Sequence, residues 1–137
     1  MNTEKPYISD KFGRKHDYLR ISLTDKCNLR CFYCMPEEGI ALRERAQFMT
    51  AEELIEIAKT FINLGVKKIR LTGGEPLIKR NASLVISELG KLPIELSITT
   101  NAILVDKYIE SFKVAGIKSI NVSLDTLREN RFNDITK

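Results

Sequence analysis

The feature that most restricts the fold of this chain is a regular alternation of short two-faced strands with amphipathic helices. Residues 18–24 alternate between apolar and polar side chains, a period-two pattern that predicts a β-strand. Three further strands are predicted at residues 66–72, 94–100 and 117–124, and a segment with helical spacing precedes each of them. The resulting order β-α-β-α-β-α-β predicts parallel strands joined by right-handed crossovers.

The intervening helices carry recognisable end signals. Thr50 and Glu53 form a capping box at the start of the first helix. Shorter helices are predicted at residues 82–89 and 106–115, and another begins near Leu127. The face expected to be buried consists of Leu54, Ile57, Ala58, Phe61 and Ile62 on the first helix, and of Ile109 and Phe112 on the third.

The polar side chains of the strands form a set of their own. They are Arg20, Ser22, Thr24, Lys68, Arg70, Thr72, Glu95, Ser97, Thr99, Ser119, Asn121, Ser123 and Asp125. Parallel strands are normally buried on both faces, so a polar face is unusual. The pattern predicts an α/β fold, specifically a partial (βα) barrel with helices outside and a polar ligand inside. The alternative is a sheet face that is simply exposed to solvent.

All three cysteines lie within eight residues, at Cys27, Cys31 and Cys34, and the only histidine, His16, lies well upstream and is expected on the surface. An odd, bunched set is a poor disulfide framework, and clustered thiols in a reducing compartment more often bind metal. Structural zinc needs four protein ligands, and an iron–sulfur cluster is usually held by four thiolates. Three thiols therefore predict a metal centre with one open coordination position.

Other distinctive stretches follow the remaining strands. Gly73-Gly74-Glu75-Pro76 follows the second strand, Thr99-Thr100-Asn101 ends the third, and Ser123 and Asp125 end the fourth. In βα architectures the functional residues gather at the C-terminal ends of the strands. We therefore expect all of these residues on one rim, together with the cysteine loop.

The spacing C-x-x-x-C-x-x-C, with Phe32-Tyr33 before the third cysteine and the Gly-Gly-Glu-Pro turn one βα unit later, resembles the radical S-adenosylmethionine (SAM) superfamily. Further stretches resemble the GTP 3′,8-cyclase family of molybdenum cofactor biosynthesis: residues 18–26, Met35-Pro36, residues 69–76, residues 99–101 and residues 121–127. The resemblance runs from about Tyr18 to the last residue.

This resemblance implies a 4Fe–4S cluster whose fourth iron binds SAM. One electron from the cluster cleaves a carbon–sulfur bond and releases a 5′-deoxyadenosyl radical. The radical takes a hydrogen atom from the ribose of GTP, and the sugar carbon then attacks the purine to give 3′,8-cyclo-7,8-dihydro-GTP. A partner protein, cyclic pyranopterin monophosphate synthase, performs the next step, and an electron donor reduces the cluster.

The resemblance also assigns residues by position. It implies that the cluster is bound by Cys27, Cys31 and Cys34, that SAM is contacted by Tyr33, Gly74, Glu75 and Ser123, and that GTP is contacted by Arg20, Arg70, Thr99 and Lys68. Two guanidinium groups suit a triphosphate because each offers forked donors and a fixed charge. The simpler alternatives are a tight turn at the glycines, a packing role for Tyr33, and strand-end hydrogen bonds for Thr99 and Ser123.

The chain is shorter than the family's pattern. We expect an N-terminal arm at residues 1–17 and, at 18–137, the N-terminal portion of a barrel that stops after its fourth strand. The second cysteine triplet and the glycine-rich tail of the family are absent, so the fragment alone is expected not to cyclise GTP. Its last strand is expected to leave a free edge, open to a second copy or to a complementing C-terminal fragment.

Composition excludes several classes of partner. The net charge of +4 is spread along the chain without a basic stripe, which argues against nucleic-acid binding. There is no secretory h-region and no apolar run of about 18 residues, so a cytoplasmic protein without membrane spans is expected. Two other functions stay open: a radical SAM enzyme with another substrate, and a non-catalytic fragment that serves as a metal-bound structural piece or an interaction module.

Overall fold

The structure is a computed structural model that describes residues 6–36 and 38–137. Its strands are β1 (Tyr18–Ser22), β2 (Lys68–Thr72), β3 (Glu95–Thr100) and β4 (Ile120–Val122). Its α-helices are α1 (Ala51–Asn63), α2 (Ala82–Gly90), α3 (Val105–Val114) and α4 (Glu129–Thr136), and short 3₁₀ helices are η1 (Arg45–Gln47) and η2 (Pro76–Ile78). The predicted alternation of strands and helices is therefore confirmed.

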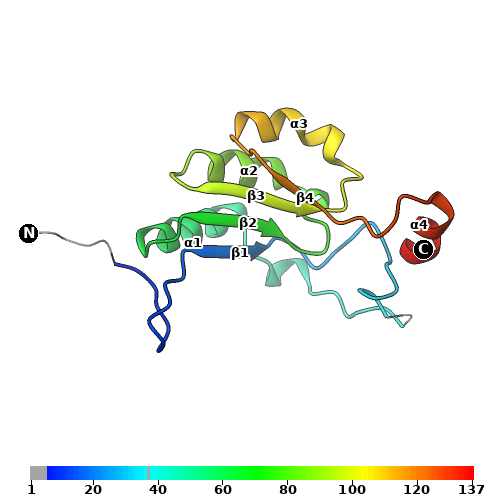
Figure 1. Ribbon diagram of the computed structural model, residues 1–137, viewed down its shortest axis with the longest axis horizontal. Helices are drawn as coiled ribbons and strands as arrows, with labels where there is room; N and C mark the ends of the chain where they lie inside the picture. Colours follow the sequence, from blue (N-terminus) through cyan, green and yellow to red (C-terminus); the bar gives the residue numbers. More distant parts are fainter. Residues whose placement is uncertain (1–5, 37) are drawn as a thin grey trace, which may run out of the picture.

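The four strands form one parallel sheet in the order β1-β2-β3-β4. Figure 1 shows α1 and α2 behind the strands, while the opposite face of the sheet is not covered by a helix. The predicted parallel sheet with helices on its outer side is therefore confirmed. The sheet is open, because these four strands do not close a barrel. No helix in the described ranges is long and apolar enough to cross a membrane.

The core lies between the sheet and its helices. The alternate apolar strand residues Ile21, Leu23, Ile69, Leu71, Leu96 and Ile98 are buried against Leu54, Ala58, Val85, Ile86, Leu89 and Phe112. Two residues expected in the core are instead partly exposed to solvent. Ile57 is 37% exposed and Ile109 is 38% exposed. The capping box of α1 is confirmed, since Thr50 accepts from the Glu53 amide and Glu53 accepts from the Thr50 amide.

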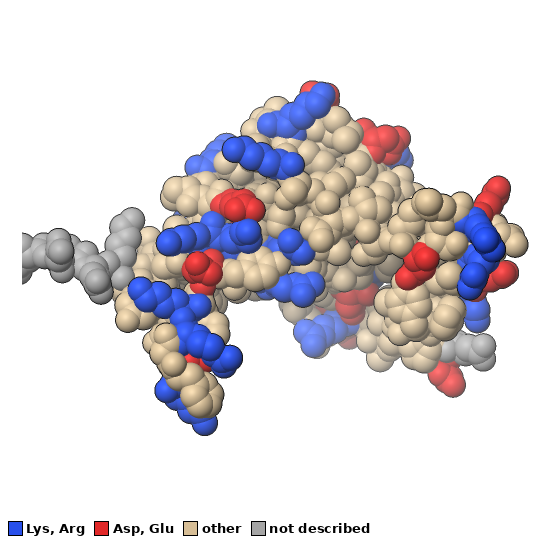
Figure 2. Space-filling model, viewed as in Figure 1, with Lys and Arg blue, Asp and Glu red and all other residues tan. Residues whose placement is uncertain are grey.

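Strand register places the polar residues in rows across the uncovered face. Arg20 pairs with Arg70, and Arg70 pairs with Ser97. Because side chains alternate between the faces of a strand, these residues point away from the helices that cover the apolar side. Figure 2 shows this side of the molecule, with Lys and Arg side chains gathered over part of it.

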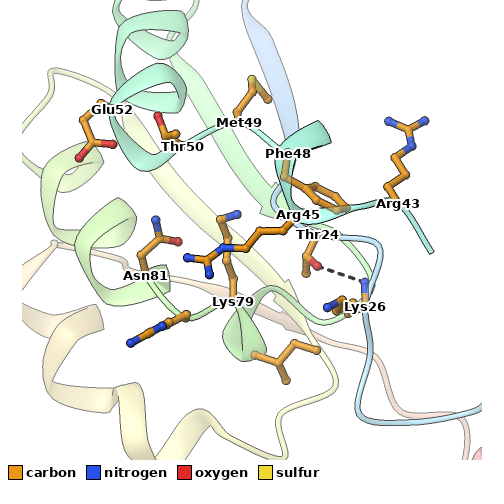
Figure 3. Close-up of a pocket in the computed structure, with 12 residues that line it drawn as sticks. Thr24, Lys26, Arg43, Arg45, Phe48, Met49, Thr50, Glu52, Lys79 and Asn81 are labelled. Carbon is orange, nitrogen blue, oxygen red and sulfur yellow. Dashed lines mark hydrogen bonds between the residues drawn. The ribbon is translucent and has the colours of Figure 1, made fainter.

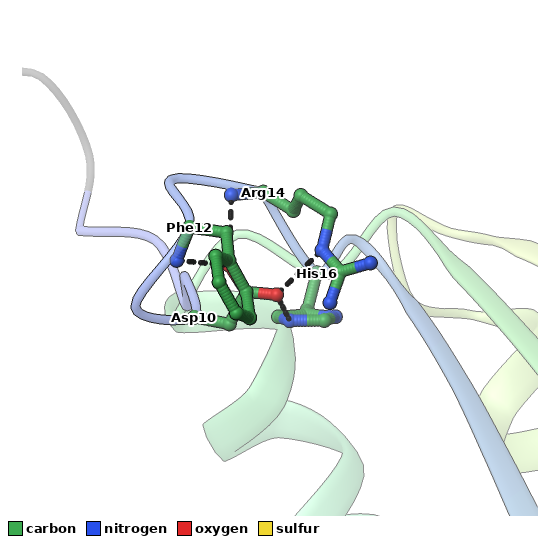
Figure 4. A network of polar contacts seen from close by, with 4 residues as sticks. All are labelled: Asp10, Phe12, Arg14 and His16. Carbon is green, nitrogen blue, oxygen red and sulfur yellow. Dashed lines mark hydrogen bonds and ion pairs between the residues drawn. The ribbon is translucent and has the colours of Figure 1, made fainter.

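The N-terminal arm forms a small turn of its own before β1. Ser9 and Lys15 make an antiparallel bridge. The Asp10 carboxylate accepts hydrogen bonds from the Phe12 amide at 2.9 Å and from both the amide and Nε of Arg14 at 3.0 and 2.6 Å (Figure 4). His16 lies 3.8 Å from the same carboxylate and remains half exposed, as expected for a surface histidine.

Candidate functional site

The Gly-Gly-Glu-Pro turn after β2 is packed directly against the segment that leads into the cysteine loop. The Gly74 amide donates to the Thr24 carbonyl at 2.7 Å, and the Glu75 amide donates to the Lys26 carbonyl at 2.8 Å. A Cβ at Gly73 would lie 2.6 Å from the Thr24 oxygen, and one at Gly74 would overlap the Lys26 carbonyl. Only glycine allows the two backbones to approach this closely, so the turn fixes the start of the cysteine loop.

Glu75 is a buried carboxylate that joins the ends of two strands. Its Oε1 accepts from the Thr100 hydroxyl at 2.7 Å and from the Leu77 amide at 3.1 Å, and its Oε2 accepts from the Asn101 amide at 2.8 Å. Only 1% of the residue is exposed. Both oxygens therefore already have donors from the protein, and the contact of Glu75 with SAM stays a prediction.

The cysteines lie on one loop at the C-terminal rim of the sheet. The sulfur of Cys27 accepts from the Leu29 amide at 3.4 Å and lies 3.9 Å from the Asn101 side-chain nitrogen, which places it beside the end of β3. A tight turn joins the other two, because the Cys34 amide donates to the Cys31 carbonyl at 2.9 Å. All three are free thiols, and Cys34 is the most exposed.

The Cys34 thiol lies within electrostatic reach of the other two cysteines. Burial raises the pKa of the Cys34 thiol, and the neighbouring Cys31, Cys27 and Asp125 raise it further. A bound cation reverses such mutual repulsion, since a coordinating thiol is deprotonated by its metal. Their proximity is what a shared inorganic group requires.

The three free thiols on this loop are the donor set for a bound inorganic group. Among the side chains described, no three Cys, His, Asp or Glu residues are arranged to hold one ion. A single ion draws all its ligands into one shell, whereas a cluster binds each thiolate at a different iron and needs more widely spaced sulfurs. Donors such as the Leu29 amide are the kind of contact that tunes cluster sulfurs. Three free thiols on one loop are the kind of donors that three-point attachment of an iron–sulfur cluster needs.

The far side of the cysteine loop is held by the C-terminal segment. The Arg30 amide donates to the Thr136 carbonyl at 2.8 Å, and the Phe32 amide donates to the Ile135 carbonyl at 3.1 Å. Helix α4 accordingly lies beside this loop at the right of Figure 1. The loop is thus clamped between the turn after β2 and the end of α4.

A side-chain contact adds to this clamp. The Tyr33 hydroxyl donates to Asp125 at 2.7 Å, and this hydrogen bond, with desolvation, raises the pKa of Tyr33 well above its ordinary value. From the sequence, Asp125 was predicted only to lie on the rim. Its pairing with a residue 92 positions away, like that of Glu75 with Thr100, had no local signal in the sequence.

The predicted substrate residues lie side by side on the uncovered face. Arg20 and Arg70 are register partners, and Arg70 donates from Nε to the Ser97 hydroxyl at 3.3 Å. The Arg20 guanidinium has no partner among the described residues. Lys68, one row further from the rim, forms an ion pair with Glu95 at 3.1 Å. The structure thus brings the two arginines together and gives Lys68 a competing partner.

Two other predicted residues lie nearer the rim. Thr99 is half-buried beside Asn121 of β4. Ser123 is exposed, and its amide donates to the Thr100 carbonyl at 2.8 Å. Gly74, Tyr33 and Ser123 therefore all lie at the C-terminal ends of the strands, where the sequence predicted them, although their contacts with a ligand stay predictions.

Comparisons with known proteins agree with this arrangement. The profile of the radical SAM superfamily matches residues 21–137. The chain is 47% identical to the GTP 3′,8-cyclase of Peptoclostridium acidaminophilum over 97% of its own length and 42% of that relative. It is also 47% identical to molybdenum cofactor biosynthesis protein 1 of Dictyostelium discoideum, over 98% of the chain and 22% of the relative.

Solved structures give the same fold. Streptococcus suis SuiB bound to S-adenosylmethionine matches 87% of the chain and 27% of its own chain, with a TM-score of 0.66 and 25% identity. SuiB bound to its precursor peptide SuiA matches with a TM-score of 0.69 and 27% identity, over 87% of this chain and 26% of its own. The chain thus spans about two fifths or less of the relatives and structures named here.

Proposed function

The chain belongs to the radical SAM superfamily, and we propose that it is the cluster- and cofactor-binding portion of a GTP 3′,8-cyclase of molybdenum cofactor biosynthesis. The observation that carries this proposal is 45–49% identity, over 93–97% of the chain, to bacterial proteins of that name. The structural neighbour with a peptide partner is only 27% identical, so it gives weaker guidance on the substrate.

Cys27, Cys31 and Cys34 hold a 4Fe–4S cluster in this proposal. When bound, the cluster supplies the electron that breaks a carbon–sulfur bond of SAM. The protein's own contribution is to fix the loop at its start, through the Gly74 and Glu75 amides, and at its far side, through α4. Such preorganisation limits side reactions of the cofactor.

The SAM-binding residues surround the same rim. Tyr33 faces it from the loop, Gly74 from the turn after β2, and Ser123 from the end of β4. Glu75 acts in this proposal mainly by orienting Asn101 and the Gly-Gly turn, because its carboxylate already accepts three hydrogen bonds. In this proposal the remaining lone pairs of the carboxylate accept a hydrogen bond from the methionine ammonium of SAM.

Arg20 and Arg70 bind the triphosphate of GTP on the uncovered face, with Thr99 closer to the rim. Arg70 lies two residues before the end of β2, roughly 7 Å back along the strand at about 3.3 Å per residue, and Gly74 follows that end. The triphosphate therefore lies deeper on the sheet than the cofactor, and the ribose is directed toward the rim. Lys68 contacts GTP in this proposal only if GTP displaces it from its ion pair with Glu95.

The proposal is tested by anaerobic reconstitution with iron and sulfide, followed by SAM, GTP and a reductant. We expect reductive cleavage of SAM to 5′-deoxyadenosine, and GTP binding that Arg20→Ala or Arg70→Ala weakens without affecting SAM. Lys67→Ala is the control, because Lys67 is an exposed cation that precedes β2. The proposal fails if neither arginine substitution changes GTP affinity.

Other outcomes identify the competing functions. Cleavage of SAM without GTP binding indicates a radical SAM enzyme with a different substrate, and stoichiometric zinc without a cluster indicates a structural or interaction module. In the proposed function, an external electron donor reduces the cluster, and the cyclised product passes to cyclic pyranopterin monophosphate synthase.

A further inference from the structure

A cavity of about 750 Å³ lies beside the rim, between the connection that precedes α1 and the connection from η2 to α2 (Figure 3). None of the residues predicted to bind the cluster, SAM or GTP lines it. Five cations do: Lys26, Arg43, Arg45, Lys79 and Arg80. Among the described residues that line it, Glu52 alone carries a carboxylate.

These cations are not neutralised by the rest of the described chain. None of the five has a carboxylate within ion-pair distance in residues 6–36 and 38–137. Lys59, Lys91 and Lys113 each pair with a glutamate three residues earlier. Other cations of the described chain, such as Arg20, are unpaired as well, but these five surround one concave space. Gathering unpaired like charges around a concave space creates a strong positive potential, which attracts an anion.

The side chains are arranged to receive a ligand. In the view of Figure 3, Arg45 and Lys79 both extend toward the middle of the cavity, while Arg43 extends away at its edge. The Lys79 ammonium is 5.8 Å from the centre of the Phe48 ring, which supports it against an apolar wall. Helices α1 and α2 begin at this cavity, at Thr50 and Asn81, so their dipoles add to the positive potential.

The size of the cavity distinguishes between kinds of anion. Small-molecule sites are concave and measure about 300–1,000 Å³, whereas a protein partner needs an extended face of about 800 Å². We propose that this cavity binds a compact phosphorylated small molecule with at least two phosphates, at a site separate from the GTP-binding face. Its phosphates contact Arg45, Lys79, Arg80 and Lys26, and the rest of the ligand contacts Phe48.

The test is calorimetric titration of the full chain with inorganic pyrophosphate and inorganic triphosphate at a fixed ionic strength of about 0.15 M, where the Debye length is about 8 Å. We expect one site per chain, and a loss of about tenfold or more in affinity for each contacting cation removed, as for hydrogen bonds to charged groups. Arg45→Ala and Lys79→Ala are the test variants, singly and together. Lys107→Ala with Lys118→Ala removes the same charge from exposed positions and should leave affinity within about twofold, because exposed charges beyond a Debye length are screened.

Three results overturn the proposal. They are no binding of either anion, equal weakening by the pocket and control variants, and tight binding of polyglutamate in place of triphosphate, which indicates a docking face for an acidic protein.

If Lys79→Ala unfolds the chain, Arg45→Ala with Lys26→Ala replaces it. Arg20→Ala with Arg70→Ala should abolish GTP binding at the sheet face and leave pyrophosphate binding intact, so this site and the proposed function can fail independently.

Discussion

Replacing Gly74 with alanine tests whether the turn after β2 and the start of the cysteine loop form one unit. The new Cβ would overlap the Lys26 carbonyl and lie 2.9 Å from the Asp25 carbonyl. The backbones must separate, which weakens two hydrogen bonds worth about 1 kcal/mol each and adds overpacking strain of about 1–3 kcal/mol. We expect a loss of about 2–4 kcal/mol in the free energy of unfolding, in line with these values.

That loss is measurable as a thermal shift. At about 2.1 cal/mol/K per residue, 137 residues have an unfolding entropy of about 0.29 kcal/mol/K, so the midpoint should fall by about 7–14 °C. Iron uptake on anaerobic reconstitution should fall as well, because the displaced segment carries Cys27.

Gly116→Ala is the matched control for this substitution. Its Cβ meets no atom within 4 Å, but its φ of +72° costs an alanine about 1–2 kcal/mol. Because Gly116 precedes β4, at the opposite end of the strands from the rim, its substitution should lower the midpoint without reducing iron uptake. A Gly74→Ala protein with a midpoint within about 2 °C of the parent and full iron uptake refutes the reasoning.

Three further predictions follow from the same contacts. Glu75→Gln turns an amide donor toward the Asn101 amide and should lower the free energy of unfolding by about 1–3 kcal/mol. The measurement is the midpoint of urea unfolding, and an unchanged midpoint contradicts the role of the carboxylate. Arg70→Ala should weaken GTP binding about tenfold or more while SAM binding and the Lys67→Ala control stay unchanged, measured by calorimetry. Thr50→Ala removes the N-cap of α1 and should cost about 1 kcal/mol by thermal unfolding, and Thr50→Ser should restore most of it.

Local patterns in the sequence were sufficient to predict the scaffold. Each strand and helix was predicted at nearly its observed position, because alternation, the Thr50 capping box and the glycines that end helices all act over a few residues. The fourth strand was predicted too long, at residues 117–124 in place of Ile120–Val122. It is an edge strand, and its length depends on pairing with only three residues of β3.

The site was predicted in outline and not in its contacts. The rule that strand ends gather on one rim placed the cysteines, Gly74 and Ser123 correctly relative to the sheet. The partners of Glu75 were not foreseen, because Thr100 and Asn101 are brought to it only by the crossover through α2. The cationic cavity was likewise not predicted, since Lys26 and Arg45 lie far apart on the β1–α1 connection and Lys79 lies on the β2–α2 connection.

The most direct test of the account is the iron and sulfide content of the chain after anaerobic reconstitution, read together with its electron paramagnetic resonance. We predict a 4Fe–4S spectrum that changes when SAM is added and is lost when Cys27, Cys31 and Cys34 are replaced by alanine. Failure to take up iron, or equal uptake by the triple variant, contradicts the claim that these three thiols hold the cluster.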